Sequence, residues 1–173
     1  MRPDELKALV RDVPDFPEPG ILFRDITPLL GDPAGLRAAI DWFAEAVARS
    51  GADVVVGVES RGFVFGAPVA DRLHLPFVPV RKPGKLPAAR MSQEYALEYG
   101  TSQLDIHADA FGDGANVAII DDLLATGGTA DASAKLTELA GGKVALFAFL
   151  IELGALEGRQ RLGGYRVESL LVY

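Results

Sequence analysis

Four short apolar runs recur along the chain without polar alternation, and each run is typical of a strand that is buried on both faces. Between successive runs the spacing of apolar residues changes to that of a helix. This alternation predicts an α/β fold with a central, mostly parallel sheet flanked by helices, in which ligands bind beyond the carboxyl ends of the strands. The predicted strands are residues 53–58, 77–80, 117–120 and 144–151.

The clearest predicted helix begins after Asp32, which is a good N-cap, with Pro33 in its first position. Apolar residues then recur on one face, and Gly51 is expected to end the helix. A second helix is expected after residues 59–62 and a third at about residues 129–140. The apolar face of the first helix consists of Leu36, Ile40, Phe43 and Val47.

The amino-terminal segment lacks this regular alternation. A short helix is predicted at residues 4–12, and Pro14, Pro17, Pro19 and Gly20 then favour an irregular loop that continues toward residue 30. No linker separates this segment from the rest, so a single domain is expected over residues 1–173.

Composition narrows the classes of protein that this chain could be. Its 173 residues fit one domain, and the lack of cysteine excludes disulfides, zinc–cysteine clusters and thiol nucleophiles. The longest apolar run, residues 144–151, is far below the roughly 18 residues that span a bilayer, and acids occupy the start where a signal peptide is apolar. We therefore expect a cytoplasmic protein with no membrane partner.

The charge balance bears on the partners. Seventeen basic and twenty-four acidic residues give a net charge of −7, which argues against nucleic-acid binding, so any polyanion must be bound by local groups. The sequence contains no GxxxxGK[ST], HExxH or GxSxG motif. The two histidines, His74 and His107, are expected to be structural.

The strongest functional signal is VAIIDDLLATGGTA at residues 117–130. Its glycines allow a sharp turn and a close approach to a ligand, and the helix that follows offers unpaired N–H groups. Asp121 and Asp122 can accept hydrogen bonds from sugar hydroxyls, which points to a ribose 5-phosphate ligand. The alternative is that the aspartates cap a helix and the glycines only form a turn. The candidate phosphate-binding residues are Ala125, Thr126, Gly127, Gly128 and Thr129.

This segment resembles the 5-phosphoribosyl-1-pyrophosphate (PRPP) signature of type I phosphoribosyltransferases. Further stretches narrow the resemblance to the branch of that family that acts on adenine, and they follow the family's order along essentially the whole chain. The resemblance implies the type I phosphoribosyltransferase fold, with a small hood at about residues 14–31 and a mobile loop at about residues 82–94. The stretches are FPEPGILFRDITPLL, GVESRGFVFGAPVA, VPVRKPGKLP, YALEYG and LIELGALEGRQRL.

Glu59, Ser60 and Arg61 begin the turn after the first buried strand, where N–H groups and a guanidinium can bind pyrophosphate in a bidentate manner. The resemblance implies that this turn is the pyrophosphate loop, with a cis peptide between Glu59 and Ser60. The alternative is that Arg61 is a surface residue that pairs with a nearby acid.

Between residues 72 and 93 the sequence has five cations and no acid, which predicts a local positive strip that attracts a polyanion. The alternative is a solvated basic loop. The resemblance implies that RKPGKLP supplies its cations, Arg81, Lys82 and Lys85, to pyrophosphate, in some members across a dimer interface. Residues 88–91 depart from the usual family pattern. The five cations are Arg72, Arg81, Lys82, Lys85 and Arg90.

Residues 95–100 alternate like a strand, so Glu98 and Tyr99 are expected to face opposite ways. The resemblance implies a catalytic role for Glu98 near the base and the leaving group, where it gives or takes a proton, and for Tyr99 near the reacting centre. The alternative for Glu98 is a solvent-facing position.

An aromatic ring beside a cation, Phe23 next to Arg24, can stack on a flat base, whereas the alternative is that Phe23 fills the core. The resemblance implies that Leu22, Phe23 and Arg24 form the hood over adenine, that their backbone groups bind the base edge, and that Leu153 closes the pocket from the other side. Glu152 is expected to tie the end of its strand to this loop.

Together these inferences predict transfer of 5-phosphoribose from PRPP to N9 of adenine, giving AMP and pyrophosphate. Mg²⁺ is the expected cofactor, held through substrate and water near Asp121 and Asp122 and without direct protein ligands. The resemblance also implies a homodimer. Two alternatives remain: a non-catalytic regulator of the same fold that senses PRPP or a purine, and a sister transferase for another base.

Overall fold

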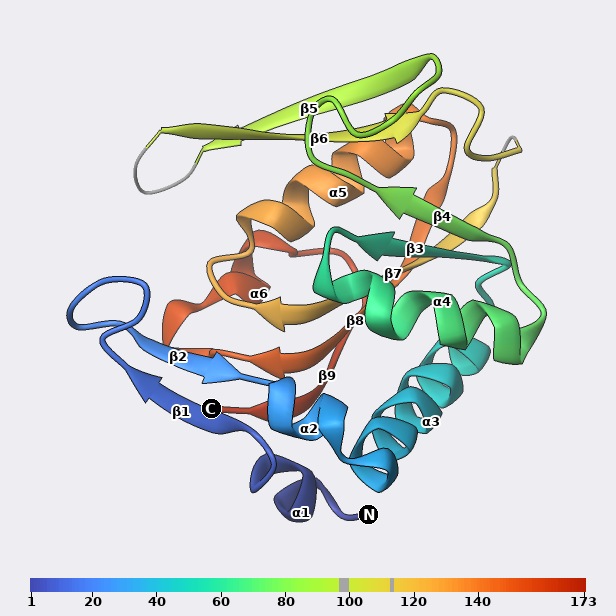
Figure 1. Cartoon of the computed structure of the whole chain (residues 1–173). Helices are drawn as coiled ribbons and strands as arrows, with labels where there is room; N and C mark the ends of the chain where they lie inside the picture. The colour runs from blue at the N-terminus through green and yellow to red at the C-terminus, as the bar shows by residue number, and fades with distance from the viewer. Residues whose placement is uncertain (97–99, 113) are drawn as a thin grey trace.

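A computed structural model of the chain, which describes residues 1–96, 100–112 and 114–173, has a five-stranded parallel sheet at its centre (Figure 1). The strand order is β4-β3-β7-β8-β9, and every neighbouring pair is parallel. The four predicted strands are confirmed, whereas β9 was not predicted. The strands are β3 (Val54–Val58), β4 (Phe77–Val80), β7 (Asn116–Leu124), β8 (Lys143–Glu152) and β9 (Val167–Val172).

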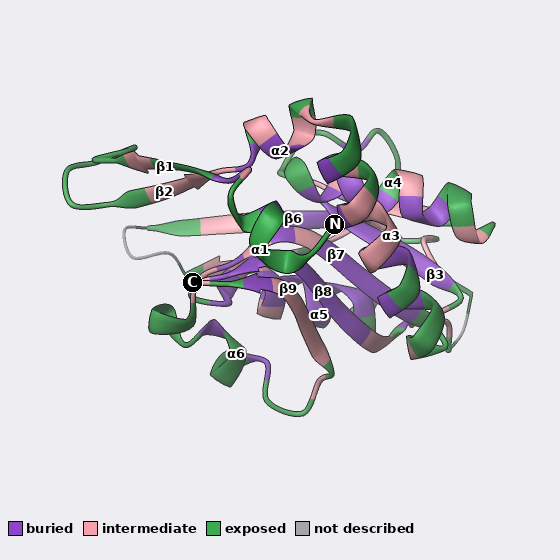
Figure 2. Ribbon diagram, turned by 90° about the horizontal axis from the view of Figure 1, so that it is seen from below, coloured by how far each residue is buried: buried purple, intermediate pink, exposed green. Residues whose placement is uncertain are grey.

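Helices cover both faces of this sheet. α3 (Pro33–Ser50) and α4 (Arg61–Leu73) bury one core with alternate strand residues such as Val55 and Ala118, and α5 (Gly128–Leu139) buries a second core with Val56 and Ile119 on the other face. The strands between these two layers of helices are mostly buried, as their purple colour in Figure 2 shows. This alternation of sides is the two-residue period of a strand, and it explains why the strands are apolar at successive positions.

The prediction for α3 is confirmed in detail. The Asp32 carboxylate accepts a hydrogen bond from the Gly35 amide at 2.7 Å, and Pro33 occupies the first turn. Gly51 ends the helix in the left-handed region with φ of 72°. The predicted apolar face packs into the first core.

The amino-terminal segment is more regular than predicted. α1 (Pro3–Lys7) is shorter than the predicted helix of residues 4–12, because β1 (Arg11–Pro14) pairs with β2 (Leu22–Asp25) in an antiparallel hairpin. α2 (Thr27–Gly31) follows, so only residues 15–21 and 26 of the predicted loop are irregular. A pairing between distant residues overrode the local helical preference. The hairpin projects from the sheet, largely exposed (Figure 2).

A second antiparallel hairpin, β5 (Arg90–Ala96) and β6 (Thr101–His107), packs over α5 through Tyr95, Leu104 and Ile106. Residues 90–94 of the expected mobile loop are therefore a strand, and its irregular part is the proline- and glycine-containing stretch 82–89.

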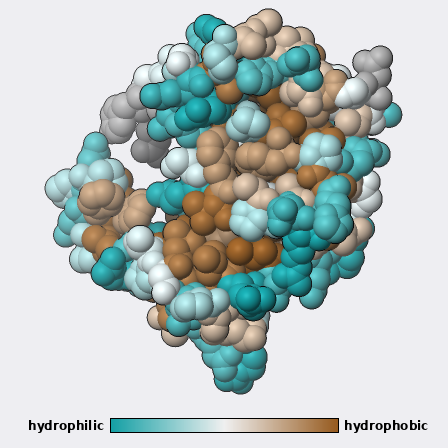
Figure 3. Space-filling model, turned by 45° about the vertical axis from the view of Figure 1, so that its right-hand side comes forward, coloured by the Kyte–Doolittle hydropathy of each residue, from teal (hydrophilic) through white to brown (hydrophobic). Residues whose placement is uncertain are grey.

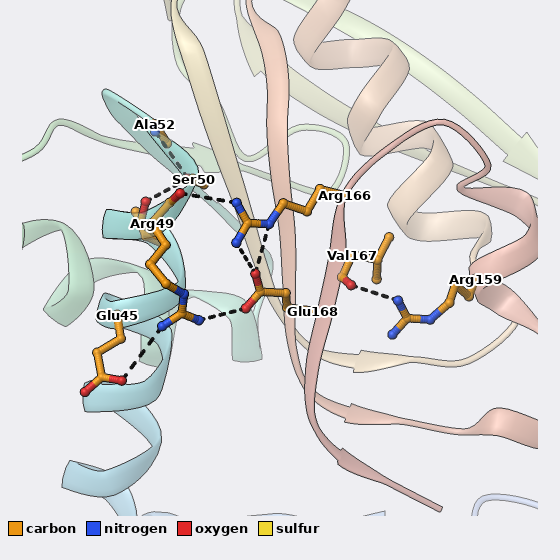
Figure 4. Close-up of polar contacts among 9 residues, drawn as sticks. Glu45, Arg49, Ser50, Ala52, Arg159, Arg166, Val167 and Glu168 are labelled. Carbon is orange, nitrogen blue, oxygen red and sulfur yellow. Dashed lines mark hydrogen bonds and ion pairs between the residues drawn. The ribbon is translucent and has the colours of Figure 1, made fainter.

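After β8 the chain forms the short 3₁₀ helix η1 (Gly154–Leu156) and α6 (Gly158–Arg161) before β9. Polar contacts tie β9 to the end of α3: Glu168 accepts from Arg49 at 3.0 Å and from Arg166 (Figure 4). Over the residues that the structure describes, no helix is both long and apolar enough to cross a membrane.

Candidate active site

A cavity of about 360 Å³ opens at the carboxyl ends of β3 and β7. It is bounded by the turn from β3 to α4, the loop from β7 to α5, and the β5–β6 hairpin. The cavity brings together most of the predicted phosphoribose and pyrophosphate residues. These are Glu59, Ser60, Arg61, Lys82, Asp121, Asp122, Ala125, Thr126, Gly127, Gly128 and Thr129.

The loop at residues 125–129, called the phosphate loop below, has the geometry expected of an anion site. Gly127 adopts φ of 82°, which side chains disfavour, and precedes the first residue of α5 without a side-chain cap. The first residues of the helix line the cavity, at the end where the helix dipole is positive. The helix is anchored by the bond from the Asp131 amide to the Gly127 carbonyl at 2.9 Å.

Asp121 and Asp122 lie inside β7 and not after it, because the strand extends to Leu124. The Asp122 amide donates to the Asp121 carboxylate at 2.8 Å, and Asp122 itself is only 6% exposed. Burial, and then the neighbouring negative charge of Asp122, raise the pKa of Asp121 well above its usual value. The site thus holds two adjacent carboxylates, one of which is costly to ionise until a cation or donor approaches.

Arg61 pairs with an acid, and that acid belongs to the site. Its Nε lies 2.5 Å from Oδ2 of Asp122, while 43% of the arginine side chain remains exposed. Its neighbour Gly62 lies against β7, since a Cβ there would be 2.6 Å from the Ile120 carbonyl oxygen. Arg61 therefore has features of both alternatives: it forms an ion pair with an acid, and it also lines the cavity.

The turn after β3 contains the expected cis peptide between Glu59 and Ser60. The Glu59 carboxylate accepts from the Lys82 amide at 2.9 Å and from Arg81 Nε at 3.2 Å. These contacts, with the Lys82 amide foremost, lower the pKa of Glu59. Glu59 thereby joins the turn to the segment that carries the cations.

Three of the five cations in the predicted positive strip are paired with acids. Arg72 pairs with Asp41, Arg81 with Glu59, and Arg90 with Asp105. Acids distant in sequence supply these partners, which a reading of residues 72–93 could not reveal. Within the described ranges, Lys82 and Lys85 make no ion pair; Lys82 lines the cavity, whereas Arg81 and Lys85 do not.

The predicted hood, about residues 14–31, covers the turn of the β1–β2 hairpin, β2 and α2. The apolar tip of this hairpin stands apart from the body across an open gap (Figure 3). Phe23 is half-buried, and its ring centre lies 5.1 Å from that of Phe16 in an edge-on arrangement. The guanidinium carbon of Arg61 lies 5.6 Å from the centre of the Phe23 ring. Phe23 therefore stays outside both cores and close to the cavity. Leu22 is exposed at the same tip.

Arg24 faces the other way, as strand alternation requires. It pairs with Asp12, and its guanidinium carbon lies 4.1 Å from the centre of the Tyr173 ring. Neither Arg24 nor Leu153 lines the cavity, although the Leu153 amide bonds to the Leu124 carbonyl at 2.9 Å. The expectation for Glu152 was wrong: it pairs with Arg159 and accepts from Ser169, not from the hood.

Glu98 and Tyr99 lie outside the described residues. Tyr95, on the same predicted strand, was missed as a site residue: it lines the cavity, and its hydroxyl lies 3.5 Å from that of Thr129. Met91, Gln93 and Tyr95 are half-buried and alternate with exposed neighbours, a pattern that becomes visible only once the strand has paired and packed. Other lining residues without a prediction are Leu104, Leu123, Leu124 and Ala130.

The histidines take no part in the cavity. His74 ends α4 in the left-handed conformation, and His107 lies at the end of β6. Outside residues 97–99 and 113, no three histidine, aspartate or glutamate side chains converge to hold a metal ion.

Comparison with known proteins agrees with this arrangement. The phosphoribosyl transferase domain family matches residues 27–171. The adenine phosphoribosyltransferase of Acaryochloris marina is 57% identical over 98% of this chain and 99% of its own, and that of Desulfitobacterium hafniense is 54% identical over the full length of both. The crystal structure of the Thermoanaerobacter pseudethanolicus enzyme superposes with a TM-score of 0.96 at 52% identity and 99% coverage of both chains. The chain therefore belongs to the adenine phosphoribosyltransferases of the phosphoribosyl transferase family.

Proposed function

We propose that this protein transfers the 5-phosphoribosyl group of PRPP to N9 of adenine and releases AMP and pyrophosphate, a purine salvage reaction. The observation that carries the proposal is one cavity in which the phosphate loop, the Asp121–Asp122 pair and Arg61 converge. A phosphorylated pentose with a pyrophosphate leaving group needs these three kinds of contact. The yeast relative, 40% identical with a TM-score of 0.92, was crystallised with an iminoalditol bisphosphate and adenine.

The phosphate loop would bind the 5-phosphate through the amides at the start of α5 and the hydroxyls of Thr126 and Thr129. Asp121 and Asp122 would accept hydrogen bonds from the ribose hydroxyls. Both contacts fix the sugar at the carboxyl end of β7, so that its anomeric carbon points across the cavity toward the β3–α4 turn.

Pyrophosphate would lie against that turn. Ser60 and Arg61 line the cavity there, and Lys82 adds an ammonium group from the neighbouring segment. Arg81 and Lys85 lie outside the lining, which accords with a homodimer in which this segment also serves the partner's site. Sedimentation at several protein concentrations would test for the dimer.

Adenine would stack beneath the hood near Phe23, with backbone groups of residues 22–24 at its edge and Leu153 on the far side. A backbone edge that fits a 6-amino purine leaves buried groups unpaired with a 6-oxo purine, and this mismatch disfavours hypoxanthine and guanine.

During transfer the C1′–oxygen bond to pyrophosphate breaks, the C1′–N9 bond forms, and N9 loses its proton. We assign Glu98 to the proton and Tyr99 to the reacting centre, both from the family resemblance. Closure of the irregular stretch 82–89, together with the β5–β6 hairpin that follows it, would exclude water from the cationic sugar.

The site also fits a magnesium ion. The Asp121 carboxylate beside the buried Asp122 has a raised pKa, so a nearby cation would favour its charged form, and oxygen is the ligand that Mg²⁺ prefers. We propose that the metal is held through substrate and water near these two residues. When bound, it would offset the charge that develops on pyrophosphate.

The test is product formation from PRPP with adenine, hypoxanthine, guanine and xanthine, each with and without Mg²⁺. We expect AMP from adenine alone, and only with the metal. Equal use of hypoxanthine or guanine would contradict the assignment of the hood, and no product with any base would point to a binding protein of the same fold.

A further inference from the structure

The segment after β8 lies against the phosphate loop with no space between the two backbones. A Cβ on Gly158 would overlap the carbonyl oxygen of Ala125 and lie 2.9 Å from the Gly127 amide nitrogen. From the other side, a Cβ on Gly127 would lie 2.6 Å from the Gly158 carbonyl oxygen. Gly158 is buried and does not adopt a positive φ. Glycine is therefore required at this position for space and not for backbone conformation.

This segment is fixed to the sheet at several points. Arg159, the next residue, binds the buried Glu152 carboxylate through two nitrogens at 3.0 and 2.5 Å. It also donates to the Val167 carbonyl at 2.8 Å, the contact that Figure 4 shows. Ser169 donates to the same carboxylate at 2.6 Å. Leu162 is buried in the second core. The backbone at Gly158 is thus held by β8 and β9 and cannot easily move away from the phosphate loop.

We propose that Gly158 is a positioning residue for phosphate binding, because the segment held by the Glu152–Arg159 pair fixes the loop at residues 125–129 through direct backbone contact at Gly158. This inference rests on the proposed function, since it takes that loop as the 5-phosphate site. The loop places amides for an anion, and a displacement of a fraction of an ångström there lengthens several hydrogen bonds at once.

The first test compares Gly158→Ala with Gly163→Ala in the full-length protein. Gly163 is a matched control because it lies in the same segment, and a Cβ there would make only an ordinary contact at 3.4 Å. We expect Gly158→Ala to raise the KM for PRPP and the Kd for AMP by about tenfold or more, while the KM for adenine changes by less than about threefold. Gly163→Ala should match the parent in all three quantities.

A uniform loss of folded protein would lower kcat and leave both KM values unchanged, so the split between PRPP and adenine separates positioning from stability. AMP binding to the parent, measured by calorimetry, separates the two proposals. No binding to the parent overturns the proposed function, whereas equal binding to the parent and to Gly158→Ala overturns only this inference.

If Gly158→Ala does not fold, Arg159→Gln tests the same contact, because it removes the pair with Glu152 that holds the backbone at Gly158 in place. Its matched control is Arg166→Gln, which removes an arginine that pairs with Glu168 away from the phosphate loop (Figure 4). We expect Arg159→Gln to raise the KM for PRPP by about threefold or more, Arg159→Lys to restore part of the loss, and Arg166→Gln to leave the KM unchanged. Equal KM values for Arg159→Gln and Arg166→Gln would overturn the inference.

Discussion

The ion pair between Arg61 and Asp122 links the two sides of the cavity, the turn after β3 and the end of β7. The guanidinium comes from the start of α4 and the carboxylate from β7, and their 2.5 Å contact lies where pyrophosphate and ribose would meet. Because Asp122 is nearly buried and Arg61 is not, the arginine can exchange its partner for a ligand while the aspartate stays in place.

Arg61→Ala should therefore impair PRPP use. We expect kcat/KM for PRPP to fall more than about tenfold, a loss of about 1.4 kcal/mol or more, because the pyrophosphate loses a guanidinium. Steady-state kinetics with PRPP as the varied substrate measures this. Arg72→Ala, which breaks the exposed pair with Asp41, is the control and should leave kcat/KM unchanged. Parent-like kinetics for Arg61→Ala would contradict the pyrophosphate assignment.

Asp121 gives a pH-dependent expectation for stability. Its pKa is raised in the folded state, so the folded protein binds the proton more tightly than the unfolded chain and loses stability as the pH rises from about 4 through the folded pKa. Asp121→Asn keeps an oxygen to accept the Asp122 amide and removes this charge. We expect the variant to melt at a higher temperature than the parent at pH 8, with the difference shrinking at acid pH.

Thermal melts from pH 4 to pH 8 measure this difference, and Asp109→Asn, at an exposed position, should show none. The same Asp121→Asn change should weaken PRPP binding, because an amide accepts from ribose hydroxyls less strongly than a carboxylate. A variant less stable than the parent at every pH would contradict the account of Asp121.

Among the elements, the β5–β6 hairpin is organised by Asp105. It is fully buried and accepts from Ser92 at 2.8 Å and Gln103 at 2.7 Å, with Arg90 3.2 Å away. Its backbone exchanges two hydrogen bonds with Arg81. One residue thus holds both ends of the loop 82–89.

Asp105→Ala should lower the free energy of unfolding by about 2 to 3 kcal/mol, since Ser92 and Gln103 lose the buried carboxylate that accepts from them. Urea denaturation measures the loss, and Asp109→Ala in the exposed turn after β6 is the matched control. A change of less than about 0.5 kcal/mol would mean that the hairpin is held by apolar packing alone.

The elements differ in how far the sequence could predict them. The buried strands and α3 were predictable because periodicity, Asp32 and Gly51 all agree locally. The β1–β2 hairpin was not, because its pairing joins residues 11–14 to 22–25 across a proline-rich turn. The ion pairs of Arg72, Arg90 and Glu152 were not predictable for the same reason, because their partners come from other elements.

At the scale of the molecule, the parallel sheet explains why the site could be located from sequence. Parallel strands bring their carboxyl ends to one edge, so the turn after β3 and the loop after β7 meet although about 60 residues separate them. The meeting of residues 59–61 and 125–129 in one cavity was predictable on this ground. Tyr95 and Gly158 were not, because their contacts depend on how a hairpin and a connecting segment fold over that edge.

A crystal structure of the protein with AMP would show whether the phosphate loop and the two aspartates bind a phosphorylated pentose. We expect the 5′-phosphate within hydrogen-bond distance of the Gly127–Thr129 amides and the ribose hydroxyls at Asp121 and Asp122. AMP bound elsewhere, or an empty cavity at saturating AMP, would contradict the account.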